Sequence, residues 1–417
     1  MFSLIRLHLV WLLLVLNGAF LNAQILQETG ELYTRVASNI SGMPSNSGDD
    51  YSEPSTSQLA TWEATLSALL TGNYTEASDS ANVIGYNLIA FTDTLTVPFV
   101  EYYLLETIDS NYWGTYVYNP NYCRPLIIQA PHAKKDAKTG NQGIHVFRET
   151  ESLFYQVNGT HRCNSSAFSA CTGTTSGCSS SSTSEPYRIS DLAHVTQSLF
   201  QKTTQVLYDA FDSTYFIQLH GFAKLSTDPY LILSNGTDQT PSPDYLPAFR
   251  DHLYNEDTVL TFKIAHIDTN WTRLRGFWNA QGRLINSSPD PCTTSATTTN
   301  GRFFHVEQEK IRLRNDENGW NKIANALKNT FACSYLSNDV LPPTSGIFVS
   351  PNPTTNCIYV RCEDGNQLPY HLLDLHGHVV MEGILIESNA QKIDIGHLKP
   401  GCYFLRVQSF AERIIKQ

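Results

Sequence analysis

The stretch RPLIIQAPH, residues 124–132, is the part of the sequence that decides the fold. Its core, PLIIQA, is almost continuously apolar, as is YFIQL at 215–219, and strands that helices cover on both faces have this composition. Helical patterns around 191–211, 244–256 and 317–331 lie among such runs. Strands that alternate with helices predict an α/β body with a partly parallel, mixed sheet flanked by helices.

Other runs in the first three quarters of the chain also have the character of strands, because apolar residues cluster in them between turn-forming residues. These runs are VIGYNLIAF (83–91), PFVEYYLLE (98–106), GTYVY (114–118), PYLIL (229–233), VLTFKI (259–264) and RFFHV (302–306). A short helix is expected over 60–70, after a stretch at 24–57 that is rich in Ser, Gly, Asn and Asp. We expect that stretch to be a loose lead-in. The predicted organisation is therefore lead-in and first strands over 24–97 and the main α/β domain over 98–340.

The N-terminus has the layout of a secretory signal peptide over residues 1–23. Arg6 precedes an apolar stretch at 7–16, and small and polar residues follow up to Ala23. Beyond this segment no apolar run approaches the roughly 18 residues of a membrane span. The chain has 417 residues and a net charge of -11, and its basic residues are scattered, which disfavours nucleic-acid binding.

None of the nine cysteines lies in the signal segment, and six of them fall in the α/β body. In an exported chain these six predict up to three disulfides, and the sequence leaves their pairing open. A zinc cluster of Cys163, Cys171 and Cys178 is the competing interpretation. We disfavour it because no CxxC pair is present. Cys171 and Cys178 belong to a long Ser/Thr/Gly-rich loop at 164–186, which begins directly after Cys163, and loops of this length often lie beside binding sites.

From residue 341 onward the pattern changes to short strands with turns, which predicts a small all-β sandwich over 341–417. The order VSPNPTTN (349–356), LLDLHGHVV (372–380), IDIGHLKPGCYFLRV (393–407) and a basic end at Lys416 resembles the C-terminal sorting domain of the Bacteroidetes type IX secretion system. This resemblance implies a Gram-negative source and the type IX secretion machinery as a partner. It also implies that the protein is secreted or attached to the cell surface.

Histidines follow the apolar strands of the body, where α/β sheets place their ligands. RPLIIQA leads to His132, YFIQL leads to His220, and RFF leads to His305 and Glu307. One such histidine is more often a structural side chain, but three strand ends of this kind in one body point to a site. Strand alternation places His305 and Glu307 on the face opposite Phe304 and Val306.

A hydrolytic zinc site needs three protein ligands, commonly histidines and a carboxylate. His132 and His220 are the candidate nitrogen ligands. For the third ligand we favour Glu149, which we expect to open a short helix, over Asp136, with Glu151 less favoured. The choice between Glu149 and Asp136 stays open.

Four further residues are candidates for roles around that zinc. Glu307 is the candidate general base, taking a proton from the attacking water and delivering it to the leaving amine. Arg162 has a planar guanidinium suited to a substrate carboxylate or a developing oxyanion. Asp191 is a candidate helix cap, and His194 is a candidate partner of a ligand or a core residue.

The motifs APH (130–132), GTHRCN (159–164), QLHG (218–221) and HVEQEKIRLR (305–314), with an acid at Glu149, resemble the N-formylglutamate amidohydrolase-like branch of the carboxypeptidase-type zinc hydrolases. The resemblance implies a phosphorylase/hydrolase-like fold. It further implies that Glu307 is the acid/base and that Arg162, with His161 beside it, binds the substrate. The zinc ligands that it implies are His132, Glu149 and His220.

These observations lead to two hypotheses from different classes. The first is an exported zinc-dependent hydrolase that cleaves an amide bond in a small or peptide-like substrate bearing a carboxylate. The second is a non-catalytic, disulfide-stabilised cell-surface or adhesion protein, a class that the tyrosine-rich and Ser/Thr-rich composition also suits. Serine hydrolysis is disfavoured because no GxSxG motif is present, and nucleotide binding because no P-loop or GxGxxG motif follows a strand.

Overall fold

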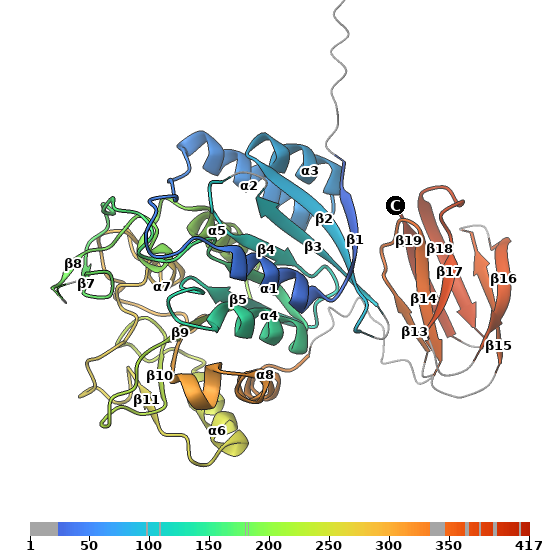
Figure 1. Cartoon of the computed structure of the whole chain (residues 1–417). Helices are drawn as coiled ribbons and strands as arrows, with labels where there is room; N and C mark the ends of the chain where they lie inside the picture. Colours follow the sequence, from blue (N-terminus) through green and yellow to red (C-terminus); the bar gives the residue numbers. More distant parts are fainter. Residues whose placement is uncertain are drawn as a thin grey trace, which may run out of the picture.

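The computed structural model describes residues 24–96, 99–107, 110–179, 181, 183–333, 347–362, 367–374, 377–386, 390–407 and 410–417. The predicted signal peptide at 1–23 and the predicted domain boundary at 340/341 lie outside the described residues. The chain forms an α/β body and a C-terminal β-sandwich (Figure 1). Both parts of the predicted fold class are confirmed.

A ten-stranded mixed sheet forms the centre of the body. In spatial order its strands are β1 (Leu26–Gly30), β2 (Tyr86–Asp93), β3 (Val100–Thr107), β4 (Thr115–Tyr118), β6 (Ser152–Val157), β5 (Arg124–Ala130), β9 (Tyr215–Gly221), β12 (Phe303–Gln308), β10 (Leu231–Ser234) and β11 (Phe262–Ile264). The run β6-β5-β9-β12 is parallel throughout, and antiparallel pairs flank it on both sides. The apolar runs of β5 and β9 therefore lie in the middle of the sheet, as their composition predicts.

Helices cover both faces of this sheet and make a three-layer body (Figure 1). On one face pack α1 (Leu32–Gly42), α4 (Thr139–Glu149), α6 (Leu246–Glu256) and α8 (Glu317–Thr330). On the other pack α2 (Thr56–Leu70), α3 (Tyr74–Val83), α5 (Leu199–Ala210) and α7 (Ala280–Ile285). Two short helical turns, η1 (Leu192–His194) and η2 (Lys310–Arg314), and a small ribbon of β7 (Thr174–Thr175) and β8 (Glu185–Pro186) complete the body.

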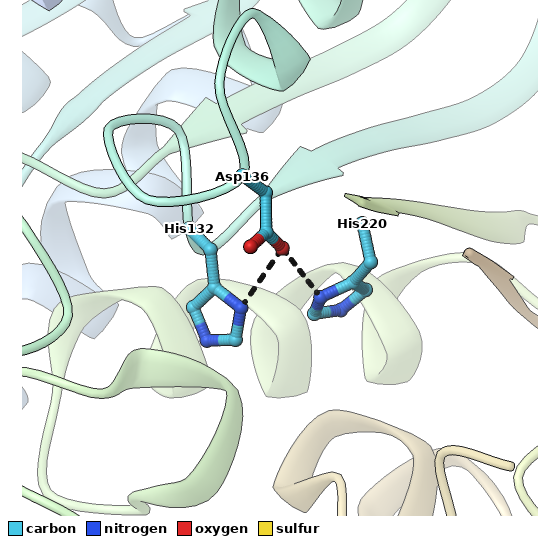
Figure 2. Close-up of side chains that lie close together, drawn as sticks. All are labelled: His132, Asp136 and His220. Carbon is cyan, nitrogen blue, oxygen red and sulfur yellow. Dashed lines mark hydrogen bonds and ion pairs between the residues drawn. The ribbon is translucent and has the colours of Figure 1, made fainter. Parts of the chain in front are cut away.

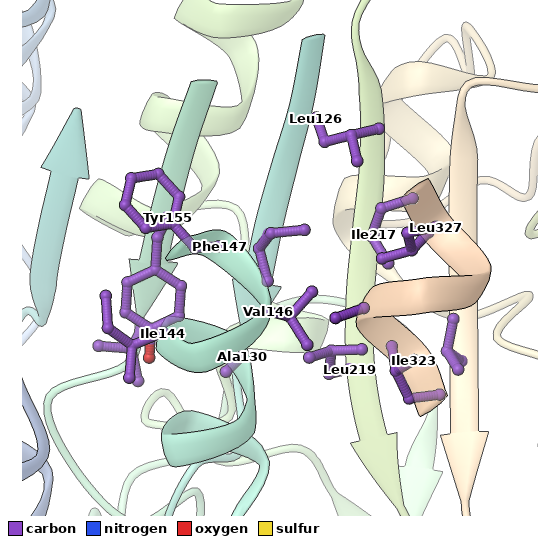
Figure 3. Packing of buried hydrophobic residues seen from close by; sticks show 14 of the residues in the cluster. Leu126, Ala130, Ile144, Val146, Phe147, Tyr155, Ile217, Leu219, Ile323 and Leu327 are labelled. Carbon is purple, nitrogen blue, oxygen red and sulfur yellow. The ribbon is translucent and has the colours of Figure 1, made fainter. Parts of the chain in front are cut away.

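Alternation along the central strands decides which side chains enter the core and which are left for a site. On β5 and β9, Leu126, Ala130, Ile217 and Leu219 pack under α4 and α8, where Figure 3 shows them against Val146 and other apolar residues of these helices. The opposite face of the same strands carries polar residues towards their carboxyl ends. This face is where a polar site can form without disturbing the core.

The lead-in region differs from its prediction. The stretch 24–57, expected to be loose, contributes β1, which pairs in parallel with β2, and helix α1. The physical reason is a stripe at helical spacing, because Leu32, Val36 and Ile40 are all buried in the core. The body therefore includes this segment.

Two differences lie near the predicted ligands. Strand β6, whose six residues are all buried, has no counterpart among the predicted strands. Helix α4 ends at Glu149, whereas the sequence interpretation has a helix beginning there. A Gly-containing first turn, TGNQG at 139–143, hid the start of this helix, because glycine is a poor helix former.

Among the described residues, the C-terminal sandwich has seven short strands in two sheets, which agrees with the predicted pattern of short strands and turns. One sheet has β13 (Ile347–Ser350), β14 (Cys357–Cys362) and β17 (Gln391–Asp394), and the other has β16 (Val379–Leu385), β15 (Leu368–Leu373), β18 (Gly401–Val407) and β19 (Phe410–Lys416). Apolar side chains such as Ile358, Leu372 and Leu405 fill the space between the sheets.

The six body cysteines form three disulfides, as predicted: Cys123–Cys333, Cys163–Cys178 and Cys171–Cys292. The competing zinc-cluster interpretation of Cys163, Cys171 and Cys178 is therefore wrong. The last two disulfides attach the Ser/Thr-rich loop both to itself and to the segment after α7.

Replacing both Cys123 and Cys333 with Ser is expected to lower the free energy of unfolding by about 2–4 kcal/mol. The bond joins residues 210 positions apart, so its loss releases a large loop in the unfolded chain. Urea unfolding followed by circular dichroism measures the change. Cys357→Ser, which removes a free thiol in the sandwich, is the control. An unchanged midpoint in the double variant would contradict the expectation.

Candidate functional site

The candidate site lies at the carboxyl ends of three adjacent parallel strands, β5, β9 and β12. His132 follows β5 by two residues, His220 is the penultimate residue of β9, and Glu307 is the penultimate residue of β12. Glu307 is directly opposite His220 in the β-ladder. The strand register therefore brings together the side chains that the sequence predicts at these three strand ends.

A cavity of about 370 Å³ opens over these strand ends. Its wall combines the strand-end residues with segments that are distant in sequence: the β7 ribbon, the segment from Tyr187 to His194, and the loop from Thr272 to Trp278. The Ser/Thr-rich loop thus reaches the candidate site, because Thr174 and Thr175 line the cavity.

His132, Asp136 and His220 all line this cavity, and their side chains point toward one another (Figure 2). The Oδ2 atom of Asp136 lies 3.2 Å from Nδ1 of His132 and 3.4 Å from Nδ1 of His220. A turn after β5 makes this possible, because the backbone N–H of Asp136 donates to the carbonyl of His132 at 2.8 Å and folds the chain back. All three side chains are buried.

Glu149, the favoured third ligand from the sequence, does not join these residues. It lies at the far end of α4, whose 11 residues span roughly 16 Å, and its carboxylate pairs with Arg148 at 3.3 Å. Glu151 lies in the exposed turn after the same helix end. The carboxylate beside the two histidines is that of Asp136, the alternative left open from the sequence.

His132 is held from its other side by a buried ion pair. Its Nε2 lies 2.7 Å from Oδ1 of Asp191, and the second oxygen of Asp191 accepts from Arg162. Asp191 is fully buried, yet Arg162 and the nearby histidines outweigh that burial and lower the pKa of its carboxyl. Because an ionised carboxylate only accepts, Nε2 of His132 carries a proton and Nδ1 faces Asp136.

His220 is held in a defined tautomer by a chain of three hydrogen bonds. The backbone N–H of Gly282 donates to Oδ1 of Asn279, so the Asn279 amide nitrogen points to Gln218 and donates to its Oε1. That same Oε1 accepts from Nε2 of His220 at 2.7 Å. Nδ1 of His220 therefore has no proton when the ring is neutral, and it is the atom that faces Asp136.

The charge states leave a place for a cation among these three residues. Burial lowers the pKa of His220 to about 4, so its ring is neutral at pH 7. Asp136 is ionised, because His132, whose own pKa is raised, outweighs the burial of Asp136 and holds the pKa of its carboxyl well below the usual range. A lone pair on Nδ1 thus faces a carboxylate oxygen with no proton between them. Two imidazole nitrogens and one carboxylate are also the donor set of many catalytic zinc sites, so the residues present fit this metal.

A second buried cluster adjoins the first through His220. The His305 ring stacks on the His220 ring with centroids 4.4 Å apart, and Nε2 of His305 lies 3.9 Å from Oε1 of Glu307. Burial, with the charge of Asp136 added, raises the pKa of Glu307 to about 8. Within the described part of the chain, no hydrogen-bond partner reaches Oε2 of Glu307 or Nδ1 of His305. Phe304 and Val306 enter the core on the opposite face, as alternation predicts.

His161 and Arg162, the last two residues of the segment GTHR at 159–162, lie in different surroundings. Arg162 lines the cavity, and its Nη1 lies 3.4 Å from Nδ1 of His132 while Nη2 donates to Asp191. His161 is not among the cavity-lining residues. Its Nδ1 accepts from the backbone N–H of Cys163 at 3.1 Å, and burial lowers its pKa to about 4.

The segment around Asp191 has a different role from the helix cap considered for it, since the Asp191 side chain makes no cap hydrogen bond to η1. His194 lines the cavity, stacks on Tyr187 with centroids 3.8 Å apart, and donates from Nδ1 to the carbonyl of Trp278 at 3.0 Å. The sequence interpretation placed neither of these contacts and did not identify Gln218. The signal available in the sequence was a polar residue two positions before His220, because strand alternation places both side chains on the same face of the sheet.

Three comparisons with known proteins bear on the C-terminal sandwich and on the α/β body. The family model described as a secretion system C-terminal sorting domain matches residues 348–417. The sandwich is therefore a type IX sorting domain, and it directs the protein to the cell surface or beyond. No curated protein sequence matches the chain.

Among solved structures, the chain is similar to N-formylglutamate amidohydrolase from Ralstonia eutropha JMP134. The two are 10% identical over 52% of this chain and 95% of that chain, with a TM-score of 0.30. That protein bears the name of the family that the motifs of the body resemble, but at this TM-score it carries no argument about function.

Among the described residues, no helix has the length and hydropathy needed to cross a bilayer.

Proposed function

We propose that the exported body is a zinc-dependent hydrolase that cleaves an amide bond in a carboxylate-bearing substrate, such as an N-acyl amino acid, a peptide end or a γ-glutamyl compound. The observation that carries the proposal is the unprotonated Nδ1 of His220, held towards Oδ2 of Asp136 beside Nδ1 of His132. This lone pair and this carboxylate, fixed together in a buried place, are donors that a metal cation would use.

His132, Asp136 and His220 would hold the zinc, so Asp136 replaces Glu149 in the proposed ligand set. Zinc supplies Lewis acidity that polarises a carbonyl and promotes ionisation of water. Asp191 and Gln218 support the two histidines by fixing which ring nitrogen is protonated. Such outer hydrogen bonds keep the ring orientations that a metal requires.

Glu307 would act as the proton carrier of the reaction. Its carboxyl group lines the cavity, and its Oε2 has no partner within the described residues, so it is free to meet a water or a leaving amine. In the metal-free chain burial raises the pKa of its carboxyl, so the group can hold a proton near neutral pH, which a residue that accepts and returns a proton must do. Arg162 lies beside His132, where its Nη1 would stabilise negative charge developing on the substrate oxygen.

Metal analysis of the purified mature chain tests this proposal. We expect about one zinc per chain in the wild type and a loss of that zinc in His132→Ala and in Asp136→Asn. Glu149→Gln is the matched control and keeps the metal. Circular dichroism verifies that each variant is folded.

Two results would overturn parts of the proposal. A chain that holds no metal, and takes up none when zinc is added, would contradict the zinc site and favour the non-catalytic adhesion protein. Zinc lost in Glu149→Gln but kept in Asp136→Asn would restore Glu149 as the third ligand.

A further inference from the structure

Arg275 is the cavity-lining cation that the proposed mechanism does not use. Its side chain is half-buried in the wall of the cavity. In the part of the chain that the structure describes, no carboxylate lies within ion-pair distance of it. Two neighbouring arginines differ in this respect, because Arg162 pairs with Asp191 and Arg273 pairs with Asp228. Arg275 is thus available for a ligand.

The loop that carries Arg275 is held firmly against the candidate site. On one side of it Leu274 has a φ of 57°, and on the other Gly276 has a φ of 69°, both in the left-handed region. A Cβ on Gly276 would come within 2.7 Å of Cγ of His305, so this loop lies directly on the His305 ring. The loop also accepts a hydrogen bond from His194 at the carbonyl of Trp278. A left-handed non-glycine residue costs conformational energy and persists only where its surroundings hold it.

The guanidinium of Arg275 lies over a neighbouring aromatic ring. The Cζ atom of Arg275 lies 4.4 Å from the centre of the Phe277 ring, in a cation–π contact with one face of the group. Among the described residues no hydrogen bond takes up the N–H donors of Arg275, so they are available to a planar anion. A carboxylate matches the edge of a guanidinium with two parallel hydrogen bonds.

Arg162 is less suited than Arg275 to bind an anion apart from the scissile bond. That arginine is held by Asp191 and lies against His132, so it suits charge at the scissile bond rather than a second, remote anion. A substrate whose carbonyl lies beside His132 and His220 would extend to the loop at 272–278 on the wall of the same cavity.

We propose that Arg275 binds a carboxylate group of the substrate on the wall of the cavity and selects substrates that carry this charge apart from the bond to be cleaved. The proposal rests on the proposed hydrolase function for the identity of the substrate. It concerns a separate residue, so it can fail or hold independently of the metal site.

The test uses the full mature chain and pairs of probes that differ only in charge: N-acetyl amino acids as free acids and as primary amides. Wild type is expected to have a kcat/KM at least tenfold higher for the acid than for the amide. In Arg275→Gln that preference falls to about one, because only the acid loses activity. Arg275→Lys keeps part of the preference. Arg273→Gln, two residues away and outside the cavity wall, keeps the full preference.

Calorimetric binding of the same probes, with zinc content measured on each sample, separates this proposal from the proposed function. If no probe is hydrolysed, a preference for binding the acid that disappears in Arg275→Gln would still support the anion subsite while the hydrolase proposal fails. Equal treatment of acid and amide by wild type would overturn the Arg275 proposal. An equal loss of the preference in Arg273→Gln would overturn it as well.

Discussion

Glu307→Gln is expected to lower kcat for amide hydrolysis by about 10²–10⁴-fold while the zinc content of the chain is unchanged. The amide is nearly the same size as the carboxyl group, but it cannot take a proton from water and return it to the leaving amine. Glu307 lies beside His305 and is not one of the three proposed ligands, so the metal should be retained. Steady-state kinetics on an N-acyl amino acid, with elemental analysis of the same sample, measures both quantities.

Glu309→Gln is the matched control for this experiment. The Glu309 carboxylate accepts from the backbone N–H groups of Ile311 and Arg312 and does not line the cavity. We expect its kcat to stay close to that of wild type. A Glu307→Gln variant that keeps full activity, or one that loses activity only together with its zinc, would remove Glu307 from the proposed proton transfer.

The fold could be predicted largely because its central strands are buried on both faces. The apolar runs of β5 and β9 identify the middle of a helix-covered sheet without any long-range information. The seven short strands of the sandwich are equally plain from their turns. Strand β6 escaped prediction because SLFYQV follows directly on the charged end of α4, and no turn-forming Gly or Pro separates them.

The site could be predicted only where one strand positions the chemistry. His132, His220 and Glu307 follow from strand ends alone, and the register of parallel strands brings them together. The position of the third ligand, Asp136, depends on a local turn after β5. The sequence pattern alone did not distinguish this turn from a ligand at a helix end. Asp191 contacts His132 across 59 residues of chain, so only the tertiary path reveals it.

The second large effect concerns the stability of the protein after its metal has been removed with a chelator. In that state burial raises the pKa of Glu307 to about 8 from its ordinary value of 4.5. Between these two values the unfolded chain has released the proton that the folded protein still holds. The unfolded state therefore binds fewer protons, and the free energy of unfolding falls as the pH rises through this window. Glu307→Gln cannot ionise and escapes this loss.

We therefore expect metal-free Glu307→Gln to gain stability over metal-free wild type by on the order of 3 kcal/mol between pH 5 and pH 8. Urea unfolding at each pH gives the two curves, and their divergence is the quantity to measure. Glu307→Met is the second variant, because it also cannot ionise but has no amide to form new hydrogen bonds. Its curve should diverge from wild type with the same sign. If the wild-type and variant curves run parallel over this range, the Glu307 carboxyl group is ionised in the folded protein. The cavity would then stabilise a negative charge at Glu307. That result would contradict the raised pKa expected from its burial beside the charge of Asp136.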